Sequence, residues 1–338
     1  MMKRYFLPLL TTGFLILSAC SCSNDAVIQQ ILGTSVEAPV FIDCRPVSSE
    51  EIVFEFSAPV KVVSLNFDPP IETNLVEDGQ EVSISLSRPL EAGAKITADI
   101  LVEDSGRNTL NVIVPFRARN DRMPALALNE IRTEYNKPRL EFIELLALEQ
   151  GNLGAMRLFI AENSLTKPVY EFPPAEVKAG EYIVLHLRTV EEGCVDETGP
   201  ELNVSPGYEA RNDARDFWIP GSSKLIRKDA AIWLMDQDDR IIDAVLLYDK
   251  PKDWDKYASA GAEFLGRKKA WLPPDGTEPG SSWIPGPADA VPSTLTSATR
   301  TICRDQTMLP SPMAGNWYVT VNSGNSAGEK NNPKRYNP

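Results

Sequence analysis

The sequence predicts an all-β protein with two immunoglobulin-like β-sandwich domains in series, the second of which carries a short helical insertion. Apolar and polar residues alternate between residues 39 and 119, which is the pattern of half-buried strands. Turn formers are abundant, with 27 prolines and 20 glycines, and such residues separate short strands. The length of 338 residues is sufficient for about two domains of ordinary size.

The chain begins with a candidate export signal. Lys3 and Arg4 precede an apolar run over residues 5–17. A basic start, an apolar middle and small residues at the cleavage site are typical of a secretory signal peptide. The alternative is a transmembrane helix, which needs about 20 apolar residues, whereas this run is shorter and is interrupted at residues 11–13. We therefore expect residues 1–19 to be cleaved.

Leu-Ser-Ala-Cys at residues 17–20 resembles the lipobox of bacterial lipoproteins. The resemblance implies that Cys20 carries a covalent lipid and that residues 20–38 form a tether. Two or three acyl chains hold a protein on a membrane far more firmly than one chain does. Ser21 resembles the outer-membrane-directed class of these proteins. We therefore expect a lipid-anchored protein of the cell envelope, outside the cytoplasm, at the outer membrane or the cell surface.

Composition narrows the possible functions. Asp and Glu number 47 against 34 Lys and Arg, for a net charge of −13. Nucleic-acid binding depends on clustered basic residues, so we expect no nucleic-acid partner. The one histidine, His186, lies in an apolar run that predicts a buried strand, and we interpret it as a packed strand residue. A single histidine also argues against zinc hydrolysis and a Ser-His-Asp triad.

Cys44, Cys194 and Cys303 follow Cys22 of the tether. Disulfides are permitted outside the cytoplasm. We predict that Cys194 pairs with Cys303, because both fall in the second domain, and that Cys44 is a buried thiol. Spacing alone leaves this connectivity open.

The first domain is expected over residues 39–120, with about seven short strands. In each expected strand the apolar residues share one face, and these residues are Ile52, Phe54 and Phe56; Val82, Ile84 and Leu86; Ile96, Ala98, Ile100 and Val102; and Leu110, Val112, Val114 and Phe116. Residues 54–60 and 87–90, with Asp104, Gly106 and Asn108, resemble the bacterial immunoglobulin-like domains of cell-surface proteins. That resemblance implies a spacer or an adhesive unit.

The second domain is expected over residues 125–331, followed by a tail at residues 332–338. Its motifs resemble, in order, those of the lamin tail domain, an immunoglobulin-like sandwich that is also found in bacterial secreted proteins. The matching segments are residues 127–131, 141–145, 179–185, 231–245, 297–300, Trp317 and residues 326–331. The resemblance implies a central hairpin at residues 231–245. Its usual Asp-Gly turn is replaced by Asp239-Arg240, and because arginine accepts positive φ poorly, we expect a longer loop over residues 236–240.

An insertion at residues 249–296 departs from that pattern. Apolar and aromatic residues recur at helical spacing, which predicts one short amphipathic helix; they are Trp254, Tyr257, Ala258, Gly261, Phe264 and Leu265. Trp254, Trp271 and Trp283 either cover the core or form an exposed aromatic surface. In the second case they are our candidate partner-binding residues.

Few residues suggest catalysis or metal binding. Asp236, Asp238, Asp239 and Asp243 are weak candidates for calcium ligands, and the alternative is a solvated hairpin loop. Glu141 and Glu144 flank two apolar residues and cannot share one face of a strand, so we interpret them as edge or turn-anchoring carboxylates rather than a catalytic dyad. We find no nucleotide-binding, redox or zinc-protease motif, and we expect no cofactor besides the lipid.

Together these features predict a non-catalytic envelope lipoprotein, a binding or structural module that presents the loops at residues 186–217 and 249–296 to a protein or glycan partner. One alternative is an extracytoplasmic hydrolase, or an accessory subunit of a nuclease or phosphoesterase, because bacterial lamin tail domains are often joined to such enzymes. Another is a carbohydrate-binding surface protein that uses its tryptophans. The fold alone does not decide among them.

Overall fold

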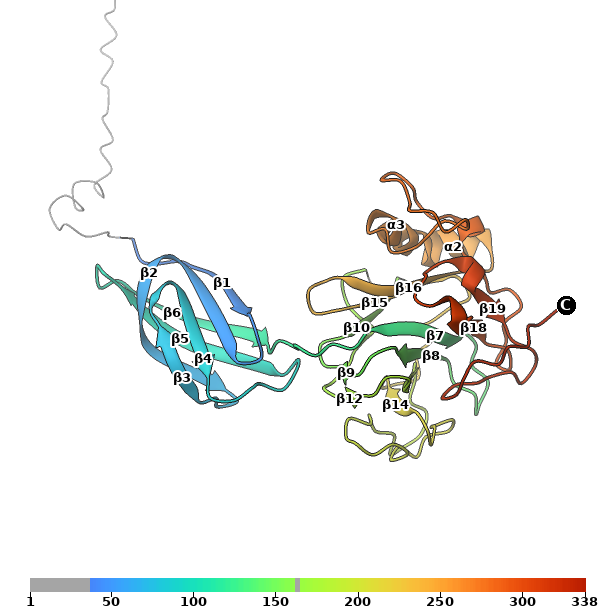
Figure 1. Cartoon of the computed structure of the whole chain (residues 1–338), viewed down its shortest axis with the longest axis horizontal. Helices are drawn as coiled ribbons and strands as arrows, with labels where there is room; N and C mark the ends of the chain where they lie inside the picture. Colours follow the sequence, from blue (N-terminus) through green and yellow to red (C-terminus); the bar gives the residue numbers. More distant parts are fainter. Residues whose placement is uncertain (1–36, 162–164) are drawn as a thin grey trace, which may run out of the picture.

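The computed structural model describes residues 37–161 and 165–338, which form an N-terminal domain and a larger C-terminal domain side by side (Figure 1). Strands make up most of the regular structure, which confirms the predicted all-β fold class. The expected signal peptide, the expected lipidation site Cys20, and Ser21 and Cys22 lie outside the described residues. Within the described part of the chain, no helix is both long enough and apolar enough to cross a membrane.

The N-terminal domain is a single sheet that bends into two layers. Its strands are β1 Phe41–Pro46, β2 Glu51–Asp68, β3 Thr73–Glu77, β4 Gly79–Leu86, β5 Lys95–Asp104 and β6 Thr109–Arg117. The order is β3-β4-β2-β5-β6, with β1 added to β2. The first half of the 18-residue β2 pairs with β1 and β4, and its second half pairs with β5. The register shifts between Glu55 and Val60, where Pro59 lacks a backbone N–H donor.

The predicted alternation in this domain is confirmed. The shared faces of the first three predicted sets are buried: Ile52, Phe54, Phe56, Val82, Ile84, Leu86, Ile96, Ala98, Ile100 and Val102. The β6 set is half-buried and packs against the same core: Leu110, Val112, Val114 and Phe116. This core is separate from that of the C-terminal domain.

The C-terminal domain packs two larger sheets around one core. The six-stranded sheet has the order β14 (Arg215–Trp218), β13 (Tyr182–His186), β8 (Phe142–Ala147), β7 (Leu126–Arg132), β18 (Ile302–Arg304) and β19 (Trp317–Val319). The five-stranded sheet has the order β11 (Tyr170–Glu171), β10 (Arg157–Ile160), β15 (Ala230–Met235), β16 (Ile241–Tyr248) and β17 (Val291–Pro292). Strands β9 (Gly151–Asn152) and β12 (Glu176–Val177) form a small third sheet. Short 3-10 helices lie at Pro287–Asp289, Gln306–Met308 and Ala314–Asn316.

The expected hairpin is formed by β15 and β16. Its loop spans residues 236–240, since the Asp236 N–H donates to the Arg240 carbonyl at 3.0 Å. Asp239 adopts the positive φ, at 60°. Arg240 therefore does not adopt the strained conformation. The longer loop expected from the sequence is therefore confirmed.

The insertion contains two short helices rather than the single helix expected: α2 Pro251–Tyr257 and α3 Ser259–Arg267. The backbone breaks at Ala258, with φ −121° and ψ −32°, outside the helical range. The predicted amphipathic face is nevertheless present, because Trp254, Ala258 and Leu265 are buried. The helices cover one face of β15, whose residues are all buried, as expected of a strand with both faces covered.

Gly261 allows α3 to approach β15 closely, and this gives a stability prediction. A Cβ atom added there would lie 2.4 Å from Ala231 Cβ and 2.6 Å from Ala161 Cβ. We expect Gly261→Val to lower the free energy of unfolding by about 1–3 kcal/mol because the core becomes overpacked. Gly280→Val is the control, since nothing lies within 4 Å of that position. Equal denaturant midpoints for the two variants would contradict this packing.

The two domains touch through closely approaching backbones. A Cβ atom added to Gly154 of the C-terminal domain would lie 2.3 Å from the Ala92 carbonyl oxygen of the N-terminal domain. One added to Gly93, which has φ +72°, would lie 2.7 Å from the Ala155 nitrogen. Only glycine permits an approach this close. We call residues 118–125, which connect β6 to β7, together with these contacts, the joint.

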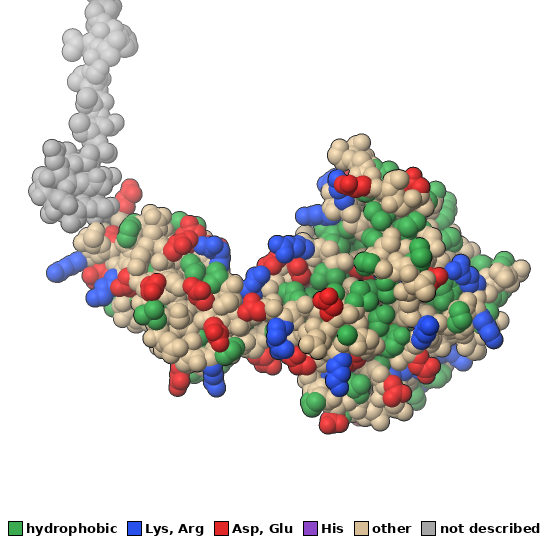
Figure 2. All heavy atoms as spheres, viewed as in Figure 1, with side chains coloured by type: hydrophobic (Ala, Val, Ile, Leu, Met, Phe, Trp, Pro, Cys, Tyr) green, Lys and Arg blue, Asp and Glu red, His purple; other side chains and the backbone are tan. Residues whose placement is uncertain are grey.

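Hydrogen bonds and ion pairs fix the joint. The buried Asn120 donates from Nδ2 to the carbonyls of Asn152 and Gly154 at 2.7 and 2.8 Å, and its backbone N–H donates to Gln237 Oε1 at 2.8 Å. Ion pairs cross between the domains nearby: Arg117–Glu171 and Arg119–Asp238. Figure 2 shows opposite charges side by side along this border. The joint therefore holds the domains in one orientation.

Candidate binding loop and buried polar network

The candidate functional site is the long loop at residues 187–214, which we call the binding loop. It connects β13 to β14, and these strands are parallel. Parallel neighbours require a crossover of a dozen or more residues, which is usually a helix, but no helix or strand is assigned within this loop. Long loops without regular structure in a compact domain are commonly functional. The loop lies within the 186–217 segment expected from the sequence to make contacts.

Carboxylates of the binding loop cap the outer edge of β14. Glu197 accepts from the Asp216 N–H at 2.9 Å, and Asp196 accepts from the Trp218 N–H at 2.7 Å. Glu197 also accepts from the N–H groups of Val204 and Ser205 at 2.8 and 3.1 Å. Unpaired edge strands invite association with other chains. The loop therefore covers the edge of the sheet with its own side chains and wraps around one buried carboxylate.

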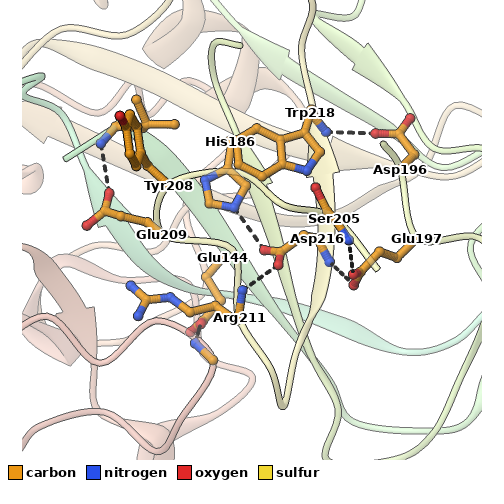
Figure 3. Close-up of polar contacts among 12 residues, drawn as sticks. Glu144, His186, Asp196, Glu197, Ser205, Tyr208, Glu209, Arg211, Asp216 and Trp218 are labelled. Carbon is orange, nitrogen blue, oxygen red and sulfur yellow. Dashed lines mark hydrogen bonds and ion pairs between the residues drawn. The ribbon is translucent and has the colours of Figure 1, made fainter. Parts of the chain in front are cut away.

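Beneath the loop lies a histidine–aspartate contact (Figure 3). His186 Nε2 lies 2.8 Å from Asp216 Oδ1, and the imidazole stacks on Trp218 with ring centroids 3.9 Å apart. His186 is 1% exposed and Asp216 is 0% exposed. The interpretation of His186 as a packed strand residue is thus confirmed. Sequence reasoning missed Asp216, whose partner is set by the parallel pairing of β13 with β14.

This contact lacks the third member of a catalytic triad. A nucleophile would need a hydrogen bond to the imidazole, and in the described residues no serine, threonine or cysteine side chain makes one. Asp216 instead accepts from the Arg211 N–H at 2.5 Å. The His186–Asp216 contact therefore joins β13 to β14, and the bond from Arg211 joins the loop to the sheet.

The outer surface of the binding loop exposes apolar groups. Val195, Val204 and Tyr208 are 48%, 54% and 43% exposed. The Lys137 ammonium lies 5.5 Å from the centre of the Tyr208 ring, which brings a neighbouring loop to the same surface. Exposed apolar groups on a loop that is bonded to the sheet are candidate contacts for a partner. We call Val195, Val204 and Tyr208 the loop surface.

The predicted aromatic contact surface of the insertion is wrong. Trp254 and Trp271 are 5% and 0% exposed, and Trp271 Nε1 donates to the Asp289 carbonyl at 2.8 Å. Trp283 is half-buried and packs against the same core. The alternative interpretation, that the tryptophans cover the core, is confirmed.

The four candidate calcium ligands diverge. Asp236 accepts from two N–H groups of its own turn, and each of the other three carboxylates pairs with a different arginine: Asp238 with Arg119, Asp239 with Arg157 and Asp243 with Arg304. Across the described ranges, no group of three or more His, Cys, Asp or Glu side chains is placed to hold a metal ion.

The predicted disulfide is also wrong, since Cys194 and Cys303 are free thiols. Cys194 lies beside Gly207 and Trp218 at the β14 end of the six-stranded sheet, whereas Cys303 is in β18. β13, β8 and β7 lie between β14 and β18, which places β14 and β18 about 19 Å apart at the usual strand spacing. A disulfide needs Cα atoms within about 7 Å. Cys44 is half-buried, and burial raises the pKa of its thiol to about 12.

Two buried glutamates attach the C-terminal segment to this sheet. Glu130 and Glu144 are directly opposite each other on β7 and β8. Ser326 Oγ donates to Glu130 at 2.7 Å, and the Gly328 N–H donates to Glu144 at 2.5 Å. Burial raises the pKa of both carboxyl groups. Glu141 instead pairs with Arg188, so the two carboxylates have separate partners. Glu144 is not at an edge, because β8 lies inside the six-stranded sheet.

A groove of about 700 Å³ lies beside the joint. Its four arginines each pair with a carboxylate: Arg45 with Glu81, Arg117 with Glu171, Arg119 with Asp238 and Arg157 with Asp239. Since their charge is already compensated, we interpret the groove as part of the joint.

One of the comparisons with known proteins covers the C-terminal domain. Residues 124–319 match a family model, TP_1001_2nd, described as a protein second domain. An uncharacterised protein of Treponema pallidum (strain Nichols) is 31% identical over 170 residues, which are 48% of this chain and 41% of that protein. The chain thus matches less than half the length of this relative. No solved structure matches.

Proposed function

The chain belongs to the TP_1001_2nd family, and we propose that it is a non-catalytic cell-envelope lipoprotein whose two β domains act as one rigid arm. In this proposal Cys20 carries the lipid, and the binding loop contacts a partner protein. The N-terminal domain, which follows the expected anchor in the sequence, and the C-terminal domain lie at opposite ends of the molecule (Figure 1). An anchor at Cys20 would therefore place the loop surface beyond the N-terminal domain.

We also infer that the C-terminal domain is a divergent relative of the lamin tail domain and that the N-terminal domain belongs with the bacterial immunoglobulin-like domains. The order of the motifs supports the first inference, because the motifs at residues 127–131, 141–145, 179–185 and 231–245 coincide largely with β7, β8, β13 and the β15–β16 hairpin. These strands line one core. A spacer role of the N-terminal domain follows from the second inference.

The joint is the observation that carries the proposal. A flexible linker would let two domains move independently, whereas Asn120 is buried and bonded to the C-terminal domain. Gly93 and Gly154 bring the backbones into direct contact. The absence of catalytic activity is supported by the buried carboxylates, which are bonded to backbone and arginine groups within the fold.

Lipid attachment is tested in cells that express the full chain. We expect metabolic labelling with a palmitate analogue to mark the protein, and Cys20→Ala to remove the label and release the protein from membranes. Cys22→Ala is the matched control and should retain both. A labelled Cys20→Ala variant, or unlabelled wild type in the cytosol, would reject the anchor.

Partner binding is tested by photo-crosslinking in the same cells. A crosslinking residue at Val204, 54% exposed, should capture a defined partner, whereas one at Ile113, 67% exposed on β6, should not. Equal capture from both positions would contradict a specific loop surface. Turnover of nuclease, phosphatase or esterase substrates by the purified full chain would contradict the non-catalytic part of the proposal.

A further inference from the structure

A polar cavity of about 690 Å³ lies beside β18 and β19 in the C-terminal domain. The segment that encloses it is at the end of the molecule away from the N-terminal domain (Figure 1). Residues that line it include Gln306, Tyr318, Asn325, Glu329, Lys330 and Asn332. We call it the C-terminal cavity. It is distinct from the binding loop.

The wall of the cavity is held by buried polar contacts. Asn331 is 6% exposed, and its Nδ2 donates to the Arg304 carbonyl at 2.8 Å and to Asn129 Oδ1 at 2.9 Å. Ser326 is fixed by Glu130. Because these anchors belong to the domain core, the wall is formed before any ligand binds, which lowers the entropic cost of binding.

Two asparagines present amide donors beside the cavity. Asn325 Oδ1 accepts from the Ala327 N–H at 3.2 Å, and Asn332 Oδ1 accepts from the Lys334 N–H at 3.0 Å. These bonds fix the side chains through their oxygens, and within residues 37–161 and 165–338 neither Nδ2 group has a hydrogen-bond partner. Each Nδ2 carries two donor hydrogens. Both amides are therefore oriented by the fold and remain available to a ligand.

The charges around the cavity balance. Glu329 and Lys330 are exposed, and in the described part of the chain neither makes an ion pair. Arg335 lies 3.7 Å from Asp305. Arg304 also lines the cavity, but its charge is compensated by the buried Asp243. The remaining two cationic and two anionic side chains give no net attraction for an anion or a cation. An uncharged ligand that both donates and accepts hydrogen bonds suits this surface best.

Tyr318 adds a flat apolar surface. Its hydroxyl donates to the Asn332 carbonyl at 2.8 Å. The Arg335 guanidinium lies over the ring, 4.9 Å from its centre, so a ligand would contact the part of the ring that Arg335 leaves uncovered. A pyranose ring has hydroxyl groups around its edge and C–H groups on its faces, so it suits an aromatic ring bordered by amides.

We propose that the C-terminal cavity binds a neutral oligosaccharide, with Asn325 and Asn332 donating to its hydroxyl groups and Tyr318 contacting a sugar ring. This goes beyond the proposed function, because it assigns a second ligand to a surface outside the binding loop. It also relocates carbohydrate recognition from the buried tryptophans to an amide-rich site.

The test uses the full chain in a non-glycosidic detergent and titrates it with N,N′-diacetylchitobiose, cellobiose and maltose by calorimetry. We expect saturable binding of at least one of them at concentrations up to about 10 mM, which detects millimolar Kd values. Asn325→Asp retains the oxygen that accepts from Ala327 but removes the amide donors. It should weaken binding about tenfold, the change expected for one lost hydrogen bond. Asn332→Asp should act in the same way.

The matched control is Asn111→Asp, on an exposed position of β6, which should bind like the wild type. Thermal unfolding confirms that each variant is folded. The proposal is overturned if none of the three sugars binds saturably, or if Asn325→Asp and Asn111→Asp bind equally well. Preferential binding of a glucuronic acid disaccharide over all three neutral sugars would also overturn it.

Discussion

Arg304→Met is expected to lower the free energy of unfolding of the C-terminal domain by about 3–5 kcal/mol, because it leaves a buried carboxylate without its cation. Arg304 on β18 pairs with Asp243 on β16 and so links the two larger sheets. The side chains of this pair are 0% and 4% exposed. Arg304 also donates to the Ser311 carbonyl at 2.8 Å. Denaturant unfolding measures the loss.

The pH dependence and a double variant identify the cause of this loss. Burial raises the pKa of Asp243 even beside Arg304, and removal of the cation should raise it further. Both proteins lose stability as pH rises above the unfolded value for Asp, because the folded-state pKa is raised in each. The deficit of Arg304→Met should therefore begin to grow only as pH rises past the raised pKa of Asp243 in the wild-type fold, up to the still higher pKa in the variant. Adding Asp243→Asn, which can still accept from the Leu128 N–H, should recover most of the stability. A double variant as unstable as Arg304→Met would reject the uncompensated-charge explanation.

Glu197→Ala is expected to open the binding loop and abolish crosslinking from the loop surface. Glu197 is 1% exposed and accepts from the N–H groups of Val204, Ser205 and Asp216. Each unsatisfied buried donor costs about 1–3 kcal/mol. Because water reaches the opened loop and hydrates these donors in part, we expect the variant to lower the stability of the closed loop by about 3 kcal/mol in total. Hydrogen exchange at these three amides measures the opening.

Glu192→Ala is the control for this prediction, because Glu192 is an exposed carboxylate of the same loop. It should leave both amide exchange and crosslinking unchanged. If Glu197→Ala opens the loop but the photo-crosslinking residue at Val204 still captures the partner, the binding loop is not the contact surface.

The alternation of apolar residues was sufficient to predict β4, β5, β6 and the first half of β2, and with them much of the core of the N-terminal domain. It did not predict β1 or β3, and the described part of this domain has six strands rather than about seven. The bend of β2 was not predictable, because residues on both sides of Pro59 alternate in the same way and only pairing with distant strands distinguishes the two layers. The break of the insertion helix at Ala258 was missed for a similar reason. Helical spacing continues across it, from Trp254 to Leu265.

The candidate site depends more strongly on contacts between distant residues. Sequence reasoning located the 186–217 loop and the structural role of His186, but not Asp216, Asp196 or Glu197. Asp216 reaches His186 only because β13 and β14 pair in parallel. Asp196 and Glu197 accept from N–H groups at the edge of β14, which the sequence does not identify as an edge strand. Burial of the tryptophans depends on how the helices cover β15. The failed Cys194–Cys303 pairing depends on strand order, which spacing along the chain does not reveal.

The parallel pairing of β13 with β14 limits how this family can vary in length. After His186 the chain must return along the whole strand before Arg215 can pair beside Ile183, so a tight two-residue turn cannot replace residues 187–214. A homologue with a large deletion there would have to give up β14 as well, leaving β13 as the outermost strand. Insertions are not restricted in this way. We therefore expect relatives that differ in length at this position to have mostly longer loops.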